Sequence, residues 1–455
     1  MSVAVGAALV LASCSYGTLS APAPADVPTT TSSPSLDIVE RSPSLLASRP
    51  VTVSAAPVMS PATPPDSTPP EPATPTSPAP GGSPLVSASP SASARPAADQ
   101  LVADPDPTAV PFPPCPGIHC LSIVISGDVL LHPQLIEQAR ADAGAVPDTT
   151  VDGLNFLPLL AGQRRYVAGA DIGICHLETP LAPPQGPFSN YPTFSVPPQV
   201  LPALVATGYD ACTTASNHPL AQGTTGLDRT LNELDAAGLF HDGSYRTPEE
   251  ASTPLVVNTR AGRVGLISAA YGFNGYEPDQ DWQVNTIDIP DLKARAAHAK
   301  QAGADLVIVA LHAGDEYDHQ PNAQQKDAAK ALLADPDIDL VYGHHAHVVQ
   351  PLERINGKWA IYGLGNNLAA QLDSAPGVQQ GLLVRMQFSL DAGGSWTTSD
   401  VAWVPSYQQP SAPYRWCALT PTDTCGTGDD TALDETTAIV DQWGASTDGG
   451  AHRLN

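Results

Sequence analysis

The segment with the clearest chemical potential is the run Asp-Leu-Val-Tyr-Gly-His-His-Ala-His at positions 339–347. An apolar stretch typical of a buried strand ends at Gly343, and three imidazoles follow within four positions. Neutral imidazole is a common metal ligand, and the spacing of His345 and His347 can bring two rings to one ion or to a close pair of ions. An exposed histidine cluster is the plain alternative, but the strand-then-turn context favours a metal site.

Polar side chains also follow four other apolar runs, each at the point where a strand is expected to end. They are Asp128, the pair His176 and Glu178, the pair Asn217 and His218, and His312. Taken singly, each has an ordinary explanation, such as a turn cap for Asp128 or a buried core histidine for His312. Open α/β sheets bind ligands at the carboxyl ends of their strands, so the joint pattern predicts one crevice lined by all five segments.

The elements that must position these residues alternate between apolar runs and helical periods. The expected strands are 121–126, 171–175, 209–214, 254–258, 263–269, 305–311 and 338–342, with shorter ones at 352–355, 358–362, 381–388 and 401–404. The expected helices are 155–169, 199–207, 225–237, 289–302 and 322–334. This order predicts an α/β layered fold, and the late strands indicate a second sheet packed on the first.

Composition divides the chain into a short N-terminal apolar segment (residues 1–14), a tether, a folded domain and a tail. A Pro/Ser/Thr/Ala-rich stretch over residues 15–114 reads as a disordered tether, because such sequence has little to bury. One folded domain is expected over 115–407, followed by a tail over 408–455. The net charge is −26, and only 20 residues are Lys or Arg, which makes nucleic acid an unsuitable partner. An anionic ligand would therefore need metal ions to attract it locally.

The first 14 residues resemble the apolar region of a secretory signal, too short to span a bilayer. Leu-Ala-Ser-Cys at 11–14 resembles a bacterial lipobox, which predicts a lipidated Cys14 and a membrane-anchored protein outside the cytoplasm. Six further cysteines suit an oxidising compartment. The simplest of fifteen pairings is 115–120, 175–212 and 417–425. Cysteine ligation of zinc is less suitable, because no Cys-x-x-Cys pair occurs.

Six segments together resemble the CapA group of poly-γ-glutamate capsule biosynthesis proteins, a branch of the calcineurin-like metallophosphoesterase superfamily. They are 127–128, 176–178, 216–218, 311–317, 343–347 and 361–366, and the last two are the most specific. The resemblance implies a four-layer αββα sandwich with a metal site between loops at one edge of two sheets. It also implies that the protein binds or acts on an anionic envelope polymer, or on a phosphoester substrate, outside the membrane.

The resemblance assigns roles residue by residue. Asp128 would bind one cation, Glu178 would bridge, Asn217 and His312 would bind a second cation, and His345 and His347 would complete both sets of ligands. His218 would stand beside the site and act as an acid or stabilise a developing negative charge, and it and Asp128 would be the catalytic residues. His176, Glu316, His344 and Asn366 would surround the ligands or face the substrate. Oxygen and imidazole ligands suit Mn, Fe or Zn.

Four positions depart from the family pattern. Leu130 stands where the superfamily often has a histidine, and His176 replaces the usual asparagine. Ala221 and Asn367 replace a usual aspartate and phenylalanine. Two cations are expected, but these changes leave open a single cation, unless His176 or His132 compensates.

Three functional interpretations stay open. Two cations about 3.5–4 Å apart would activate a shared water and polarise a phosphoryl or carbonyl oxygen. The chain could therefore be a surface-anchored metallohydrolase acting on a phosphoester or a γ-glutamyl amide. It could instead hold or export an acidic polymer without turnover, or keep the ligands for structure only. The sequence does not indicate the metal, the natural polymer or the oligomeric state.

Overall fold

The computed structural model describes residues 108–145, 147–371, 375–420, 429–447 and 449–454. The chain divides into the units Met1–Pro84 and Leu85–Asn455, and every described residue belongs to the second unit. The expected signal segment with Cys14, and the expected tether up to residue 107, lie outside the described residues. Among the residues that are described, no helix has the length and apolar character needed to cross a membrane.

The first sheet contains nine strands among the described residues, in the order β14-β13-β12-β1-β2-β3-β4, with β11 also paired to β1 and β15 to β13. The strands β1 to β4 run parallel, whereas β12 is antiparallel to β1, so the sheet is mixed. The strands are β1 (His119–Leu130), β2 (Ile172–Leu177), β3 (Ala211–Thr213), β4 (Phe240–Asp242), β11 (Asn366–Ala369), β12 (Gln380–Leu390), β13 (Trp396–Gln408), β14 (Trp416–Ala418) and β15 (His452–Arg453).

The second sheet has six strands in the described part of the chain, in the order β5-β6-β7-β8-β10-β9. Its central strands β6, β7 and β8 run parallel, and β7 is buried along its whole length. A continuous apolar run is the usual sequence of such a strand, because both of its faces are covered. The strands are β5 (Leu255–Asn258), β6 (Arg263–Ala270), β7 (Leu306–His312), β8 (Leu340–His344), β9 (Leu352–Ile355) and β10 (Lys358–Ile361).

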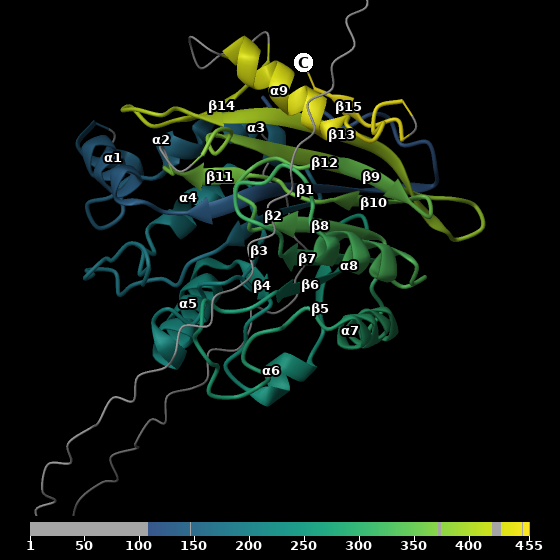
Figure 1. Ribbon diagram of the computed structural model, residues 1–455, viewed down its shortest axis with the longest axis horizontal. Coiled ribbons are helices and arrows are strands. Elements are labelled where there is room, and N and C mark those ends of the chain that lie inside the picture. The colour runs from purple at the N-terminus through teal and green to yellow at the C-terminus, as the bar shows by residue number, and fades with distance from the viewer. Residues whose placement is uncertain (1–107, 146, 372–374, 421–428, 448, 455) are drawn as a thin grey trace, which may run out of the picture. The chain divides into compact units, whose positions relative to one another are not determined.

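Helices cover the outer faces of both sheets (Figure 1). One apolar core lies between the sheets, where Ile123 and Ile125 of β1 pack in the same cluster as Ile308 of β7. A second core joins the first sheet to α1, α2, α4 and α5, and a third joins the second sheet to α7 and α8. The expected four-layer αββα sandwich is therefore confirmed. The expectation that the late strands form the second sheet is wrong, because β12 and β13 extend the first sheet beside β1 and the second sheet is built from β5 to β10. The helices are α1 (Pro133–Ala145), α2 (Leu157–Leu160), α3 (Arg164–Val167), α4 (Val200–Thr207), α5 (Gly223–Ala237), α6 (Pro248–Ser252), α7 (Ile289–Gln301), α8 (Ala323–Leu333) and α9 (Asp429–Val440).

One expected helix is wrong. The segment 155–169 forms α2, a 3-10 turn (Ala161–Gln163) and α3 instead of one continuous helix. A Cβ at Gly162 would lie 2.7 Å from the Trp416 carbonyl oxygen, so β14 crosses this segment closely. The contact is made by a residue more than 250 positions away, and no local pattern indicates it. The helices α1, α6 and α9 and the short strands β4, β11, β14 and β15 are additional to the expected set.

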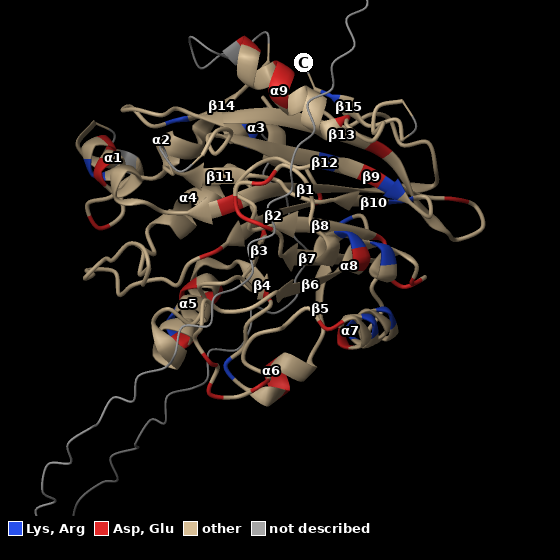
Figure 2. Ribbon diagram, viewed as in Figure 1, with Lys and Arg blue, Asp and Glu red and all other residues tan. Residues whose placement is uncertain are grey.

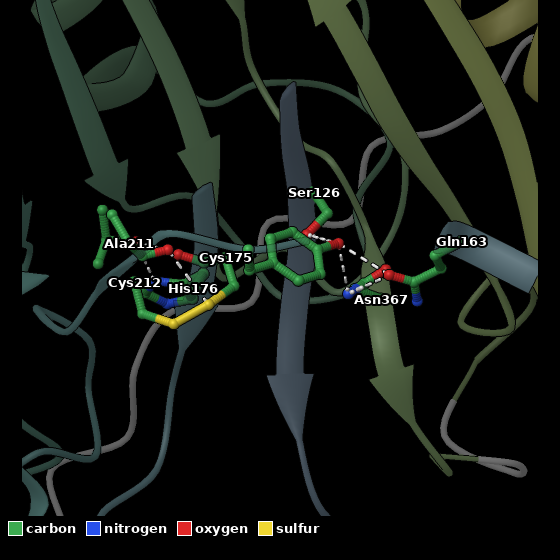
Figure 3. The surroundings of a disulfide bond; sticks show 9 residues. Ser126, Gln163, Cys175, His176, Ala211, Cys212 and Asn367 are labelled. Carbon is green, nitrogen blue, oxygen red and sulfur yellow. Dashed lines mark hydrogen bonds between the residues drawn. A yellow bond between two sulfur atoms is a disulfide. The ribbon is translucent and has the colours of Figure 1, made fainter. Parts of the chain in front are cut away.

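Two of the three expected disulfides are present. Cys115 bonds to Cys120, and Cys175 bonds to Cys212. The second bond joins directly opposed residues of the parallel strands β2 and β3 (Figure 3). The next opposed pair along these strands is His176 and Thr213. The expected partner of Cys417, Cys425, lies outside the described residues.

Candidate metal centre

Both sheets deliver polar side chains to one edge. Asp128 of β1 is opposed to His176 of β2 in the first sheet, and His312 of β7 is opposed to His344 of β8 in the second. The loop after β3 adds Asn217, and all five side chains are buried. The carboxyl ends of parallel strands share one edge, and packing the sheets face to face brings the two edges together.

Two glycines allow the backbones to approach at this edge. A Cβ on Gly127, which precedes Asp128, would overlap the carbonyl oxygen of Gly365. A Cβ on Gly343, which precedes the histidine cluster, would overlap the carbonyl oxygen of Tyr362. After Gly343 the chain turns sharply, and His345 and His347 have φ angles of +87° and +56°. Such left-handed conformations in non-glycine residues are costly and are concentrated at functional sites.

Asp128 is held by the histidine cluster. Its Oδ1 lies 2.7 Å from His344 Nδ1, and its Oδ2 lies 3.2 Å from His347 Nδ1 and accepts from the His345 backbone N–H at 3.3 Å. Burial alone would raise the pKa of Asp128, but the hydrogen bonds from His344 and His347 outweigh it and hold that pKa well below its usual value. Asp128 is therefore a carboxylate at neutral pH.

Glu178 and His347 form the second charged contact. Glu178 Oε1 lies 3.7 Å from His347 Nε2, and both Glu178 oxygens are buried with no hydrogen-bond partner. Burial raises the pKa of Glu178 to about 8. Burial would lower the pKa of His347, but the charge of Glu178 and the bond to Asp128 raise it to about 9. Asn366 Oδ1 lies 3.1 Å from His347 Nδ1, which leaves Nε2 facing Glu178.

His312 lies between a second imidazole and an amide. Its Nδ1 is 3.0 Å from His176 Nε2, and its Nε2 is 3.1 Å from Asn217 Oδ1. His176 Nδ1 in turn is 2.8 Å from Thr213 Oγ1. Burial lowers the pKa of both rings well below the usual value, and the other nearby imidazoles add to the effect, so both are neutral.

The remaining assigned residues lie around this group. The His345 ring is 4.8 Å from the His312 ring, and its Nδ1 is buried without a partner. Phe194 packs edge-on against His218 at 4.9 Å, and burial lowers the pKa of His218 to about 4. Glu316 is exposed, but its negative charge helps to raise the pKa of Glu178 and His347.

The donor set fits metal ions. Two groups bring ligand atoms within 4.8 Å of one another: Asp128 with Glu178 and His347, and Asp128 with His176 and His344. The unpartnered atoms Glu178 Oε1, Glu178 Oε2, His344 Nε2 and His345 Nδ1 are buried beside them. Leaving buried polar atoms unpaired costs about 1–3 kcal/mol each, and cation binding would remove this cost. These buried groups can hold metal ions.

The departures from the family pattern have identifiable surroundings. Leu130 and His132 line the cavity beside the site, and His132 Nδ1 lies 2.9 Å from the Leu130 carbonyl oxygen. Within the described residues, His132 belongs to neither group of close ligand atoms, whereas His176 belongs to one. Asn367 lies 3.4 Å from Gln163 and Tyr209 in a buried polar cluster on the first sheet (Figure 3).

A cavity of about 500 Å³ opens next to the site. Its walls include Tyr191, Phe194, His218, Glu316 and His347, and neither Lys nor Arg is among its lining residues in the described part of the chain. The basic residues of α7 and α8 form part of the helical layer over the second sheet (Figure 2). Attraction of an anion into the cavity would therefore depend on His347, whose pKa is raised to about 9, and on cations held at the site.

Two aromatic residues of the site were not anticipated. Tyr271 follows β6 directly, and its ring lies 4.6 Å from the His345 ring. The strand-end rule could have found it, because 263–269 was an expected strand. Phe194 lies in the long connection between β2 and α4, and no periodicity in that segment indicates its contact with His218.

Comparison with protein-family models assigns residues 122–371 to the bacterial capsule synthesis protein PGA_cap family. This match covers more than half of the chain and includes every assigned ligand. The chain belongs to this family. The PGA_cap region begins inside β1 and ends just after β11, so it contains the whole metal centre and leaves β12 to β15 outside the match.

Similar proteins include two from Bacillus. The chain is 27% identical to the capsule biosynthesis protein CapA of Bacillus anthracis, over 37% of this chain and 42% of that protein. It is 29% identical to the PGA biosynthesis protein CapA of Bacillus subtilis, over 33% and 40%. The match thus spans less than half of either relative. Among solved structures, the calcineurin-like phosphoesterase YfkN of Bacillus subtilis has 15% identity and a TM-score of 0.38, covering 70% of this chain and 97% of that chain.

Proposed function

We propose that this PGA_cap chain is a metal-dependent hydrolase that acts on an anionic polymer of the bacterial envelope, with γ-glutamyl amides as the bonds cleaved. The observation that supports it most strongly is Glu178. Its two oxygens are buried and unpartnered, beside His347 and at an edge that opens into the cavity. A buried carboxyl group whose oxygens accept no hydrogen bond gains little from its 3.7 Å contact with His347, whereas it is an efficient cation ligand.

In this proposal the chain's own residues form two half-sites. Asp128, Glu178 and His347 would hold one cation. Glu178, Asn217, His312 and His345 would hold the other, where His312 Nε2 lies 3.1 Å from Asn217 Oδ1 and the His312 and His345 rings lie 4.8 Å apart. Mn, Fe or Zn suits this mixture of carboxylate, amide and imidazole. When bound, the cations would supply a Lewis acid and a nucleophile at neutral pH. Because Leu130 contributes no ligand, the first half-site has fewer groups than the second.

His218 has the geometry of a hydrogen-bond donor to the reacting group. It lies on the cavity wall, and Phe194 packs against its ring. With a pKa lowered to about 4, it is neutral at pH 7 and so carries one ring N–H. A neutral imidazole can donate that hydrogen to a developing negative charge, or hold it for the leaving nitrogen or oxygen. Such a group typically contributes about 10²–10⁴-fold to the rate.

The cavity indicates how a polyanion would be held. Its described lining residues include no Lys or Arg. The cations would therefore neutralise one anionic group of the substrate, and no basic side chain of the cavity wall would neutralise another. The aromatic side chains of Tyr191 and Phe194 would contact the uncharged backbone of the polymer. In a poly-γ-glutamate chain, carboxylates remote from the cations would extend toward solvent. Lipidation of Cys14 would place the domain outside the cytoplasmic membrane, where such a polymer is exported.

The test compares three substrates with the purified full chain and added Mn²⁺: poly-γ-glutamate, a γ-glutamyl amide dipeptide and a phosphodiester. The proposal expects amide cleavage that is lost in His218→Ala while Mn²⁺ stays bound. If only the phosphodiester is cleaved, the proposal is wrong and the protein is a phosphoesterase unrelated to capsule. If the chain binds the polymer but cleaves none of the three substrates, the proposal is wrong and the protein is a non-catalytic polymer-binding scaffold.

A further inference from the structure

A line of four buried polar side chains connects β3 to the second half-site. Thr213 Oγ1 lies 2.8 Å from His176 Nδ1, His176 Nε2 lies 3.0 Å from His312 Nδ1, and His312 Nε2 lies 3.1 Å from Asn217 Oδ1. None of the four is more than 2% exposed. Bulk solvent therefore does not reach these four side chains, and each buried donor needs an acceptor among its protein neighbours.

Without a cation, the amide end of the line sets the direction of donation. Asn217 Oδ1 carries no hydrogen, so the 3.1 Å contact requires a hydrogen on His312 Nε2. His312 Nδ1 is then an acceptor and takes a hydrogen bond from His176 Nε2–H. His176 Nδ1 is in turn an acceptor, and the Thr213 hydroxyl donates to it. Every atom of the line is satisfied with donation running toward Asn217.

With a cation, the direction must be the opposite. His312 Nε2 can bind a cation only through its lone pair, so the hydrogen must be on Nδ1. That Nδ1–H donates to His176 Nε2, which leaves the His176 hydrogen on Nδ1, pointing at Thr213 Oγ1. The Thr213 hydroxyl can then donate to the Cys175 carbonyl oxygen at 3.4 Å. This arrangement also leaves no atom of the line unmatched.

We propose that His176 is a positioning residue that allows a cation to bind at Asn217 and His312 by reversing this hydrogen-bonded line. Both imidazoles change from the Nε2–H to the Nδ1–H tautomer. The proton on His312 Nε2 leaves to solvent on the cation side, the hydrogen between the rings passes from His176 Nε2 to His312 Nδ1, and His176 Nδ1 takes up one proton from solvent when the line opens transiently. The two rings hold two hydrogens before and after, so their part of cation binding releases no net proton.

The surroundings of His176 prevent a simpler response. Its ring stacks on that of His344 with centroids 3.9 Å apart and planes 13° apart, and the Cys175–Cys212 disulfide fixes Thr213 opposite it. Rotation of the ring is therefore opposed by packing, whereas the two tautomeric states leave the heavy atoms of the line in the same positions. The inference requires the metal centre of the proposed function but not its catalysis.

Nitrogen NMR of the full chain labelled with ¹⁵N-histidine tests the reversal directly. Spectra are compared without metal and with the diamagnetic ion Zn²⁺, and signals are assigned with His176→Gln and His312→Gln. We expect His176 and His312 both to be Nε2–H without metal and both Nδ1–H with Zn²⁺. Two rings whose tautomers stay unchanged on Zn²⁺ binding would refute the reversal. If the parent chain binds no Zn²⁺ at all, the metal centre itself fails, which is a separate result.

Variants test the role of His176 by cation affinity. His176→Leu removes the acceptor for His312 Nδ1–H, and His176→Gln keeps an acceptor oxygen near the position of Nε2. We expect about a 10–100-fold loss of Zn²⁺ affinity at the second half-site in His176→Leu, the usual effect of removing a ligand's hydrogen-bond partner. His176→Gln should keep most of the affinity. Equal losses in both variants would refute the proposal and indicate a role in packing alone.

Thr213→Val supplies an independent variant if His176→Leu does not fold. It leaves the reversed His176 Nδ1–H without an acceptor, so Zn²⁺ binding should weaken. The matched control is Thr214→Val, which removes a neighbouring buried hydroxyl bonded to the Asp242 carbonyl oxygen and not to the line. An unchanged Zn²⁺ affinity in Thr213→Val, or the same loss in Thr214→Val, would contradict the inference.

Discussion

Asp128 Oδ1 and His344 Nδ1 lie 2.7 Å apart, although the two residues are separated by 216 positions in the sequence. Asp128 is near the end of β1 in the first sheet, and His344 is at the end of β8 in the second. This contact therefore joins the two sheets at the edge that carries the candidate metal centre. It also fixes the carboxylate so that its second oxygen meets His347 at 3.2 Å. Metal binding at Asp128 would thus be coupled to the packing of the two sheets through one side chain.

Glu178→Gln should make the metal-free chain more stable while it removes cation binding. The folded-state pKa of Glu178 is about 8, above its usual value of 4.5, so ionisation disfavours the folded state as pH rises from 4.5 toward 8. At pH 8 the substitution should raise the free energy of unfolding by about 1–3 kcal/mol. Denaturation in chelator measures this gain, and Mn²⁺ titration should show a loss of at least about 100-fold.

A matched control for this substitution is Glu353→Gln. Glu353 accepts a hydrogen bond from the Tyr362 hydroxyl at 2.7 Å on β9, away from the metal groups. It should not stabilise the chain, and Mn²⁺ binding should be unchanged. Loss of stability in Glu178→Gln without metal would show that the carboxylate has a structural partner.

Mn²⁺ affinity should rise with pH. Below pH 8 the metal-free site carries protons on Glu178 (pKa about 8) and His347 (pKa about 9), and a cation must displace both. The apparent association constant should therefore increase up to about 100-fold per pH unit below 8, about tenfold per unit from 8 to 9, and little above 9. Calorimetry in buffers of different ionisation enthalpy counts the protons released. An affinity that is flat from pH 6.5 to 8.5 would contradict this assignment.

His218→Ala should reduce turnover and keep the metal. The side chain is within the cavity wall, and it belongs to neither group of close ligand atoms among the described residues. We expect kcat to fall about 10²–10⁴-fold with KM nearly unchanged. Metal content by elemental analysis should equal that of the parent. A variant that loses the cation would instead make His218 a ligand.

Gly343→Ala should disrupt the edge itself. The added methyl would overlap the Tyr362 carbonyl oxygen, which belongs to backbone and cannot move as a flexible side chain would. We expect a loss of about 2–4 kcal/mol in the free energy of unfolding, in the range for a steric clash in the core. Gly144→Ala in α1 is the control, because its Cβ would meet nothing within 4 Å, and it should stabilise by about 0.5–1 kcal/mol. Equal effects in urea denaturation would contradict the close approach.

The sequence predicts the layers well because their signals are local. The continuous apolar runs at 305–311 and 338–342 correspond to β7 and β8, and the stripe Leu227, Leu231 and Leu234 is the buried face of α5. It does not predict elements set by distant contacts. The break at Gly162 depends on Trp416, and the short strand β11 exists because it pairs with β1.

For the candidate site too, the features set by local sequence could be predicted, and the contacts between distant residues could not. Strand ends indicate that Asp128, Glu178, Asn217, His312 and the histidine cluster share an edge. They do not indicate that His176 would contact His312 across the two sheets at 3.0 Å, because that distance depends on sheet packing. They also do not separate His344, which bonds to Asp128, from His345, whose Nδ1 stays without a partner. The individual roles of the six assigned ligands stay predictions.

The central claim is that Asp128, Glu178, Asn217, His312, His345 and His347 converge on divalent cations. The most direct test is elemental analysis of the purified full chain, dialysed against trace metal, beside Asp128→Asn and Glu178→Gln variants. The parent should hold one to two equivalents of Mn, Fe or Zn, and both variants should hold less than half of that amount. A folded parent chain without bound metal, or variants that keep the full amount, would contradict the account.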